Sequence, residues 1–144
     1  MDQFFYTQTR LTKDGRPFKI YKFRTMIQNA EKDGVPRLAA EGDPRILPVG
    51  RLLRATRLDE LPQVLNILKG DMSIVGPRPE RPELVEEFTN EIPEFPDRMK
   101  VKAGLTGYAQ VYGKYNTTPY DKLKFDLMYI RKYSVLFRSE TYLL

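Results

Sequence analysis

Apolar and aromatic residues alternate with polar ones at the start of the chain, a period typical of half-buried strands. Two such runs, FFYTQTRL and PFKIYKF, lie between Phe4 and Phe23. The residues between them, Lys13–Arg16, contain Asp-Gly, a dipeptide that favours a tight turn between antiparallel strands. The sequence therefore predicts an N-terminal β-hairpin.

A helical period follows after a long interruption. Residues 29–48 are rich in glycine, proline and charge, and predict a long loop with a short helical piece. Between Gly50 and Gly70, leucine and valine recur every three or four residues, as on one face of a helix. Because proline is tolerated only in a first turn, Pro62 indicates two helices, the second of which starts near Asp59.

The remaining chain predicts short, mixed elements. We expect a buried strand at 72–75, an acidic helix over about 80–91, turn and strand in 104–113, and a last helix over about 119–133. The mixture predicts an α+β fold in a single, helix-dominated domain that opens with the hairpin.

The amino-acid composition limits the partners and the reactions that the chain can support. The chain has 24 Lys and Arg against 19 Asp and Glu, a formal charge of +5 that suits an anionic partner. It has no Cys and no His, which excludes thiolate chemistry and the commonest general base. Any reaction must use carboxylates, Lys, Arg, Tyr or hydroxyls, and a metal bound by oxygen ligands would be Mg²⁺ rather than Zn²⁺. No apolar run approaches the roughly 20 residues of a membrane-spanning helix.

One cluster combines cations with two carboxylates. Arg51, Arg54 and Arg57 lead into Asp59 and Glu60. Guanidinium groups suit phosphate oxygens, and the start of a helix favours negative charge, so Asp59 would stay ionised as a nucleophile or a metal ligand. The ordinary structural interpretation is that Asp59 caps a helix and that the arginines form a solvated face.

Two further segments could contact an anion. In GPRP, residues 76–79, the two prolines restrict the backbone around Arg78, although the same pattern fits a plain rigid turn. In residues 105–115, Lys114 could neutralise a phosphate beside flexible glycines, although a hairpin turn explains this stretch equally well. No dinucleotide-binding or P-loop motif is present.

Four segments, taken in order, resemble the bacterial sugar transferase family of monotopic phosphoglycosyl transferases. They are KIYKFRTM, RLLRATRLDELPQVLNILKGDMSIVGPRPE, VKAGLTGYAQVYG and KLKFDLMYIRKYS. Together they cover most of the chain from about Phe4 to Ser134. The second block is long and far more specific than any short motif.

The resemblance implies a reaction in two steps. An Asp carboxylate attacks the β-phosphorus of a UDP-sugar and releases UMP, which leaves a phosphosugar on the enzyme. Undecaprenyl phosphate then attacks this adduct and yields a polyprenyl diphosphosugar, the start of lipid-linked glycan synthesis for a capsule or exopolysaccharide. The sugar is left open among galactose, glucose and an N-acetylated sugar.

The family's reacting carboxylates fall on Asp59, the expected nucleophile, and on Glu60, which would help to hold Mg²⁺ or handle protons. The resemblance implies that both contribute to the metal site. Arg54 and Arg78 match family arginines that bind phosphate. Pro77 and Lys114 complete the set that we expect to contact the phosphates or the nucleotide.

The family carries a membrane-embedded helix just before the hairpin, and works at the cytoplasmic face of the bacterial inner membrane. No such segment precedes the hairpin in these 144 residues, so we expect residues 1–144 to be the catalytic domain without it. The sequence after Ser134 also departs from the family, since Arg138 lies near the place of an expected acid.

Two other functions compete. A basic domain with interleaved Tyr and Phe could bind nucleic acid without catalysis, and would not need the Asp59–Glu60 pair. A glycosidase fits poorly, because adjacent residues of a helix project about 100° apart and cannot flank a glycosidic bond.

Overall fold

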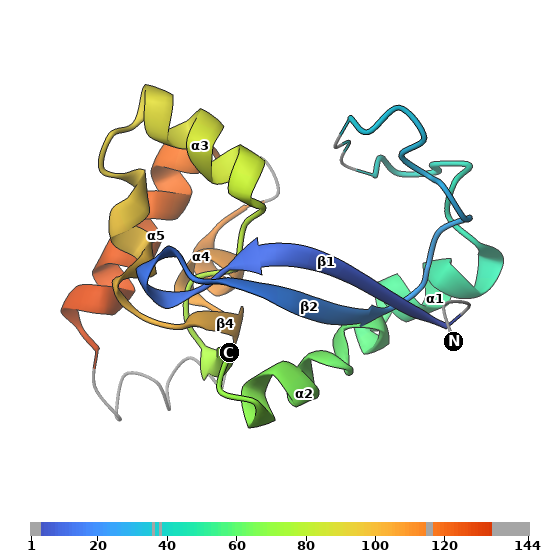
Figure 1. Cartoon of the computed structure of the whole chain (residues 1–144), viewed down its shortest axis with the longest axis horizontal. Coiled ribbons are helices and arrows are strands. Elements are labelled where there is room, and N and C mark those ends of the chain that lie inside the picture. Colours follow the sequence, from blue (N-terminus) through green and yellow to red (C-terminus); the bar gives the residue numbers. More distant parts are fainter. Residues whose placement is uncertain (1–3, 36, 38, 115–116, 134–144) are drawn as a thin grey trace. The chain divides into compact units, whose positions relative to one another are not determined.

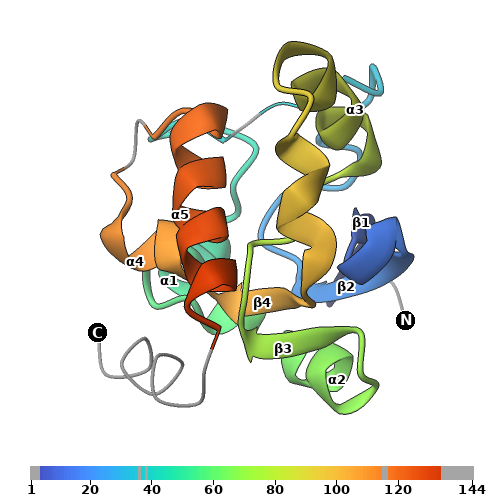
Figure 2. The same cartoon turned by 90° about the vertical axis from the view of Figure 1, so that its left-hand side faces the viewer.

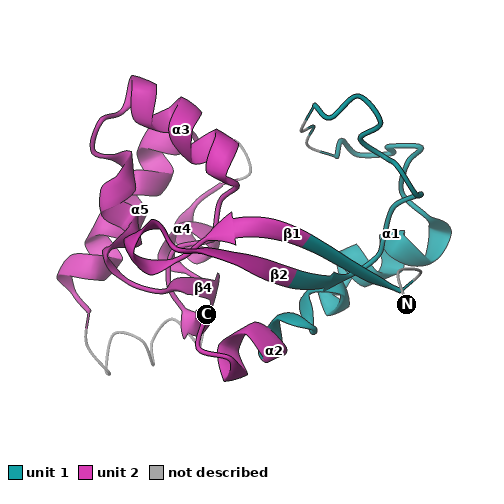
Figure 3. Ribbon diagram, viewed as in Figure 1, with its two compact units in different colours: residues 1–7, 21–64 teal, residues 8–20, 65–144 magenta. Residues whose placement is uncertain are grey.

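The computed structural model describes residues 4–35, 37, 39–114 and 117–133. Its contacts divide the chain into two compact units, coloured separately in Figure 3. Unit 1 consists of residues 1–7 and 21–64, and unit 2 of residues 8–20 and 65–144.

The chain opens with the expected hairpin. Strands β1 (Phe5–Leu11) and β2 (Pro17–Phe23) form a two-stranded sheet (Figure 1). The turn is a short 3₁₀ helix, η1 (Lys13–Gly15), in which Asp14 and Gly15 have φ angles of 60° and 72°. Asp and Gly adopt this left-handed conformation more readily than most residues, which explains the turn signal in the sequence.

Unit 1 continues into the long loop. A single antiparallel bridge pairs Met26 with Ile46. The short helical piece expected in residues 29–48 is not found in the described residues 29–35, 37 and 39–47, which form turns and bends. Helix α1 (Pro48–Ala55) then begins with proline in its first turn, where the missing N–H leaves no hydrogen bond unmade.

The expected break between two helices exists, but its position differs. Arg57 adopts a left-handed conformation, with φ of 57°, and ends the helical path. A 3₁₀ turn, η2 (Leu58–Glu60), follows, and helix α2 (Gln63–Leu68) starts only after Pro62. Asp59 therefore lies in the 3₁₀ turn and not at the start of an α-helix, which corrects the sequence-based expectation.

Unit 2 contains a second small sheet. Strands β3 (Met72–Val75) and β4 (Ala103–Thr106) run parallel, with Met72 opposite Ala103. Helix α3 (Pro82–Glu91) and a 3₁₀ helix, η3 (Phe95–Lys100), connect them, as a parallel pair requires a crossover.

The C-terminal part of unit 2 is helical. Residues Tyr108–Tyr112 form helix α4, whereas the sequence predicted turn and strand there; only β4, just before it, is extended. Helix α5 (Pro119–Arg131) forms as expected, and the Thr118 side chain caps it by accepting a hydrogen bond from the Asp121 N–H at 3.2 Å. Figure 2 shows α5 beside α4.

The apolar core belongs to unit 2. Its first cluster joins the hairpin to the parallel sheet through Phe18, Ile20, Met72 and Ala103. Its second cluster joins α3, η3 and α5 through Val85, Phe95 and Leu123. Every buried hydrophobic side chain among the described residues lies in this unit.

These elements confirm an α+β fold with an N-terminal hairpin. Within the described residues, no helix combines the length and the apolar character that crossing a bilayer requires.

Candidate functional site

The two carboxylates of the candidate site lie side by side on η2, in unit 1, and both are half-buried. Glu60 is paired with a lysine from the hairpin: Lys22 Nζ lies 3.2 Å from Glu60 Oε1. The Lys22 and Glu60 side chains are only 18% and 13% exposed, so water screens this ion pair less than a surface pair. The pair ties η2 to strand β2.

The environment of Asp59 raises the pKa of its carboxyl group. The largest cause is burial, and the second is the neighbouring negative charge of Glu60; Lys22 and Arg54 act in the opposite direction. The sequence predicted that a helix N-terminus would keep this group ionised. In η2, the cations Lys22 and Arg54 and the Asp59 backbone N–H favour the carboxylate, but burial and Glu60 outweigh them, so the pKa of Asp59 stays raised.

Arg54 is oriented from inside unit 1. Its Nε donates to Thr25 Oγ1 at 2.8 Å, and Thr25 is buried. Helix α1 packs directly on the Thr25 backbone at Gly50, where a Cβ would lie 2.2 Å from the Thr25 carbonyl oxygen. Of the other two arginines in the predicted cluster, Arg51 lies on α1 and Arg57 in the break, and both are exposed.

Sequence reasoning missed Lys22 and Thr25 as site residues. Both occur in the KIYKFRTM segment, which contributed to the family resemblance as a block and not residue by residue. A lysine in the strand after a hairpin is usually solvated, so only the fold shows that Lys22 reaches Glu60.

The other candidate residues belong to unit 2. Pro77 is buried and Arg78 partly buried, in the segment that leaves β3. Lys114 is exposed just after α4, and its N–H donates to Thr117 Oγ1 at 2.6 Å. The structure thus brings Asp59, Glu60 and Arg54 together in one unit, and places the remaining three in the other.

A small cavity adjoins the Pro77–Glu80 stretch. Its volume of about 10 Å³ suffices for one water molecule but not for a nucleotide. On α4, Gln110 Oε1 is buried and has no hydrogen-bond partner among the described residues.

The donor chemistry of the acidic pair fits a magnesium ion. No group of three or more acidic side chains that could enclose a metal occurs in the described ranges. Mg²⁺ does not need one, because it is commonly bound through one or two carboxylates together with substrate phosphates. Asp59 and Glu60 supply two adjacent carboxylates of this kind.

Comparison with known proteins gives a consistent result. The sequence profile described as "Bacterial sugar transferase" matches residues 1–143. The UDP-N-acetylgalactosamine-undecaprenyl-phosphate N-acetylgalactosaminephosphotransferase of Aeromonas hydrophila is 44% identical over 90% of this chain and 31% of its own length. The UDP-glucose:undecaprenyl-phosphate glucose-1-phosphate transferase of Escherichia coli is 46% identical over 92% of this chain and 29% of its own length.

A shorter relative from Bacillus subtilis, a putative undecaprenyl-phosphate N-acetylgalactosaminyl 1-phosphate transferase, is 55% identical over 65% of this chain and 52% of its own length. The chain therefore spans between about a third and a half of the length of these relatives.

Proposed function

Because the chain belongs to the bacterial sugar transferase family, we propose that it carries the chemistry that transfers a sugar 1-phosphate from a UDP-sugar to undecaprenyl phosphate. The observation that carries the proposal is the half-buried Asp59 carboxylate, beside Glu60 and under the influence of the cations Lys22 and Arg54. This arrangement favours sugar-phosphate transfer over nucleic-acid binding, which has no use for an acidic pair.

In the first step, a carboxylate oxygen of Asp59 attacks the β-phosphorus of the donor. A bond forms between this oxygen and phosphorus, the diphosphate bridge breaks, and UMP leaves with the electron pair. In the second step, a phosphate oxygen of the lipid acceptor attacks the same phosphorus. The aspartyl bond then breaks, and the Asp59 carboxylate is regenerated.

The surrounding groups have distinct roles in this scheme. Lys22 and Arg54 favour the ionised, nucleophilic form of Asp59 by opposing the effect of burial. Arg54 and Arg78 bind phosphate oxygens, and with Lys114 they counter the charge of the donor diphosphate. Asp59 and Glu60 would hold Mg²⁺, which supplies charge stabilisation at the diphosphate when bound.

We also propose that the chain works at a membrane surface, where a polyprenyl phosphate resides. Along the stretch from α1 to α2, large apolar side chains are exposed, and Leu68 reaches 78%. The exposed set is Val49, Leu52, Leu58, Leu61, Val64, Leu65 and Leu68. Exposed apolar side chains on short helices are suited to enter the lipid headgroup region, which is the basis of this proposal.

The proposed function is tested in the full-length protein by intact mass and by UMP release, with a panel of UDP-sugars and Mg²⁺. We expect one donor to add the mass of a phosphosugar and release one equivalent of UMP before the lipid is added. Binding of single-stranded RNA that weakens steeply with salt, without any adduct, would instead favour the nucleic-acid alternative.

The membrane proposal has its own measurement. Leu65→Ser/Leu68→Ser should lower co-sedimentation with anionic vesicles and leave UMP release from a water-soluble donor unchanged. Equal sedimentation of variant and wild type would contradict a role for these side chains.

A further inference from the structure

The segment that carries Arg78 is fixed through its carbonyl groups. Pro77 and Pro79 have no N–H, so the segment cannot form an ordinary hydrogen-bond ladder, and its buried carbonyls need donors from elsewhere. Five backbone carbonyls from Val75 to Glu80 accept a hydrogen bond from such a donor. The donors are Tyr129 Oη to Val75 (3.1 Å), Gly104 N to Pro77 (2.9 Å), Arg98 Nη2 to Arg78 (2.7 Å), Arg10 Nη1 to Pro79 (3.0 Å) and Leu11 N to Glu80 (3.1 Å).

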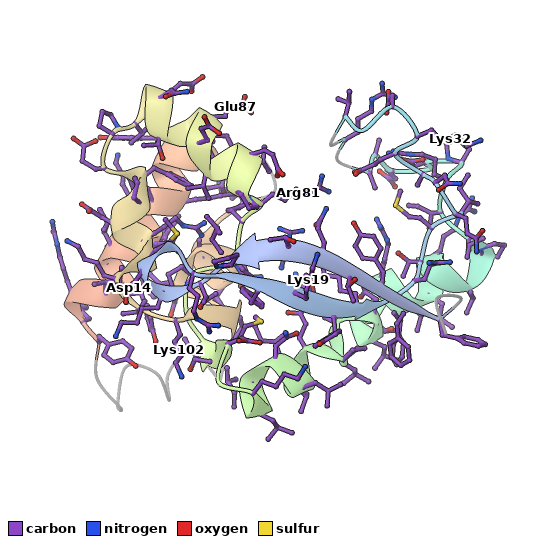
Figure 4. The ribbon with its side chains drawn as sticks, viewed as in Figure 1. Asp14, Lys19, Lys32, Arg81, Glu87 and Lys102 are labelled. Carbon is purple, nitrogen blue, oxygen red and sulfur yellow. The ribbon has the colours of Figure 1, made fainter. Side chains whose placement is uncertain are left out.

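Close backbone packing adds to this restraint. The Gly76 N–H donates to the Thr106 carbonyl at 2.9 Å, and a Cβ on Gly104 would lie 2.0 Å from the Gly76 nitrogen. The segment ends where α3 begins, after Arg81, whose position is labelled in Figure 4. Backbone and side-chain donors from β1, β4, η3 and α5 therefore converge on six consecutive residues.

One of these donors is unusual because it belongs to a buried ion pair. Arg98 Nε donates to Asp126 Oδ2 at 2.9 Å, and the two side chains are 4% and 1% exposed. Asp126 lies on the buried side of α5, between Leu123 and Tyr129, where an apolar residue would be expected. Burial raises the pKa of the Asp126 carboxyl group, and the adjacent Arg98 opposes this shift.

Such a pair is not explained by stability alone. Removing two charges from water costs several kcal/mol per ion, and replacing a buried pair by apolar residues of similar size is often neutral or stabilising. What an apolar pair could not do is donate to the Arg78 carbonyl, as Arg98 Nη2 does at 2.7 Å. Asp126 in turn fixes the orientation of the Arg98 guanidinium.

We propose that Arg98 and Asp126 are positioning residues, which fix the main chain at Arg78 so that its side chain meets the donor diphosphate in one orientation. This inference rests on the phosphate-binding role proposed for Arg78. Neither residue touches the substrate in this scheme; both act through the Arg78 carbonyl. The gain for the reaction is preorganisation, because a misplacement of about 1 Å in such a group can lower the rate by about 100-fold.

The test uses the full-length protein and the double variant Arg98→Met/Asp126→Leu, which removes both charges and retains the volume. It is compared with Arg78→Ala, with the combination of all three substitutions, and with Asp97→Asn. Asp97 lies on the same 3₁₀ helix as Arg98 in an exposed ion pair with Lys100, so it is the matched control. Each enzyme is measured for KM of the UDP-sugar, KM of undecaprenyl phosphate, kcat and the thermal unfolding midpoint.

We expect the double variant to fold with a midpoint close to that of the wild type and to raise the donor KM by roughly 10- to 100-fold. The lipid KM should not change. In the Arg78→Ala background, the same two substitutions should have less than about a twofold further effect, because residues that act through one group are not additive. Asp97→Asn should match the wild type in all four measurements.

Two results would overturn the inference. One is an unchanged donor KM with kcat reduced in proportion to the folded fraction, as a purely structural role predicts. The other is the same rise in donor KM, roughly 10- to 100-fold, when the two substitutions are made in the Arg78→Ala background, since the effects of independent residues add. If Arg78→Ala itself has wild-type kinetics, the role proposed for Arg78 fails separately, and the Asp59 adduct remains as its own measure of the proposed function.

Should the double variant not fold, Arg98→Lys provides the second measurement. Lysine keeps the charge opposite Asp126 but lacks the planar fork that holds the carboxylate and the Arg78 carbonyl together. A severalfold increase in donor KM is expected, and a folded Arg98→Lys enzyme with the wild-type donor KM would contradict the inference.

Discussion

The two units hold their candidate residues in different ways. In unit 1, Glu60 forms an ion pair with Lys22, and Arg54 donates a hydrogen bond to the Thr25 hydroxyl. The buried side chains among the described residues of this unit include Thr25, Asp43 and Gln63, all polar. In unit 2, the main chain at Arg78 accepts a hydrogen bond from the buried Arg98, and this unit contains both apolar clusters.

This difference predicts that substitutions in the two units affect the reaction rate and the stability of the fold to different extents. Substitutions around η2 should change rates with little loss of fold, because few apolar contacts depend on them. Single substitutions that break the buried pair next to Arg78 should affect both, because each leaves one charge buried without its partner. The predictions below test this contrast, from the largest expected effect to the smallest.

Replacement of the nucleophile has the largest effect. Asp59→Asn should lower UMP release by at least roughly 10³-fold, because an amide cannot form the covalent intermediate. The pKa of Asp59 is raised in the fold, so its ionised side chain lowers the stability of the fold at neutral pH. The variant should therefore unfold at a temperature no lower than the wild type, measured by circular dichroism.

A lower thermal unfolding midpoint for Asp59→Asn, with UMP release retained, would show that Asp59 stabilises the fold and does not act as the nucleophile. Asp97→Asn is the control for the loss of an acidic side chain, and should leave both measurements at the wild-type level.

A single break in the buried pair has the next largest effect, on stability. Arg98→Met leaves Asp126 buried without its partner, which should cost about 3–5 kcal/mol in the free energy of unfolding. Lys22→Met removes a partly buried partner of Glu60, which is more accessible to water than the Arg98–Asp126 pair, and should cost less than about 1 kcal/mol. Chemical denaturation of both variants measures the difference, and similar losses would show that the two units are not held differently.

The fold was predictable where local signals agree with tertiary contacts. The hairpin followed from alternation and Asp14-Gly15, and α5 from its apolar period. Residues 104–113 were predicted as turn and strand, but Tyr108–Tyr112 within this range are helical. They form α4 because this helix packs against α5, with the rings of Tyr108 and Phe125 6.0 Å apart.

The site was predictable as a set of residue types, but its electrostatics were not. Asp59 and Glu60 stood out because carboxylates beside arginines suit phosphate chemistry. The sequence could not show that Lys22 pairs with Glu60, nor that Arg98 reaches the Arg78 carbonyl. Both contacts join residues at least 20 positions apart, and one ends on a backbone atom that has no sequence signal.

The pH dependence of the reaction tests the electrostatics of unit 1. The nucleophile must be ionised, so activity should increase as the pH rises through the pKa of Asp59. Lys22→Met removes a cation that lowers this pKa, and should move the acid limb of the activity profile to higher pH. Glu60→Gln removes a charge that raises the pKa, and should move the limb to lower pH.

The measurement is the pH profile of UMP release under single-turnover conditions. Shifts of the same sign in both variants would show that their charges do not act on Asp59. Because Glu60→Gln also removes a proposed metal ligand, the position of the limb and not the maximal rate is compared.

The smallest effect is expected in the long loop of unit 1. Asp43 and Arg45 form an ion pair with Nη2 and Oδ2 2.6 Å apart, and Arg45 Nη1 donates to the Ala30 carbonyl at 3.2 Å. The hydrogen bonds from Arg45 lower the pKa of Asp43 from 3.8 to about 2. A carboxyl group whose pKa is lowered in the fold contributes stability above its unfolded pKa, and this contribution disappears as the pH falls through the folded value.

The difference in stability between wild type and Asp43→Asn should thus be constant above about pH 4 and shrink toward pH 2. Denaturation at several pH values measures it, with Asp33→Asn, from an exposed pair with Arg37 in the same loop, as the control. A difference that persists unchanged at pH 2 would mean that the charge of Asp43 does not hold the loop.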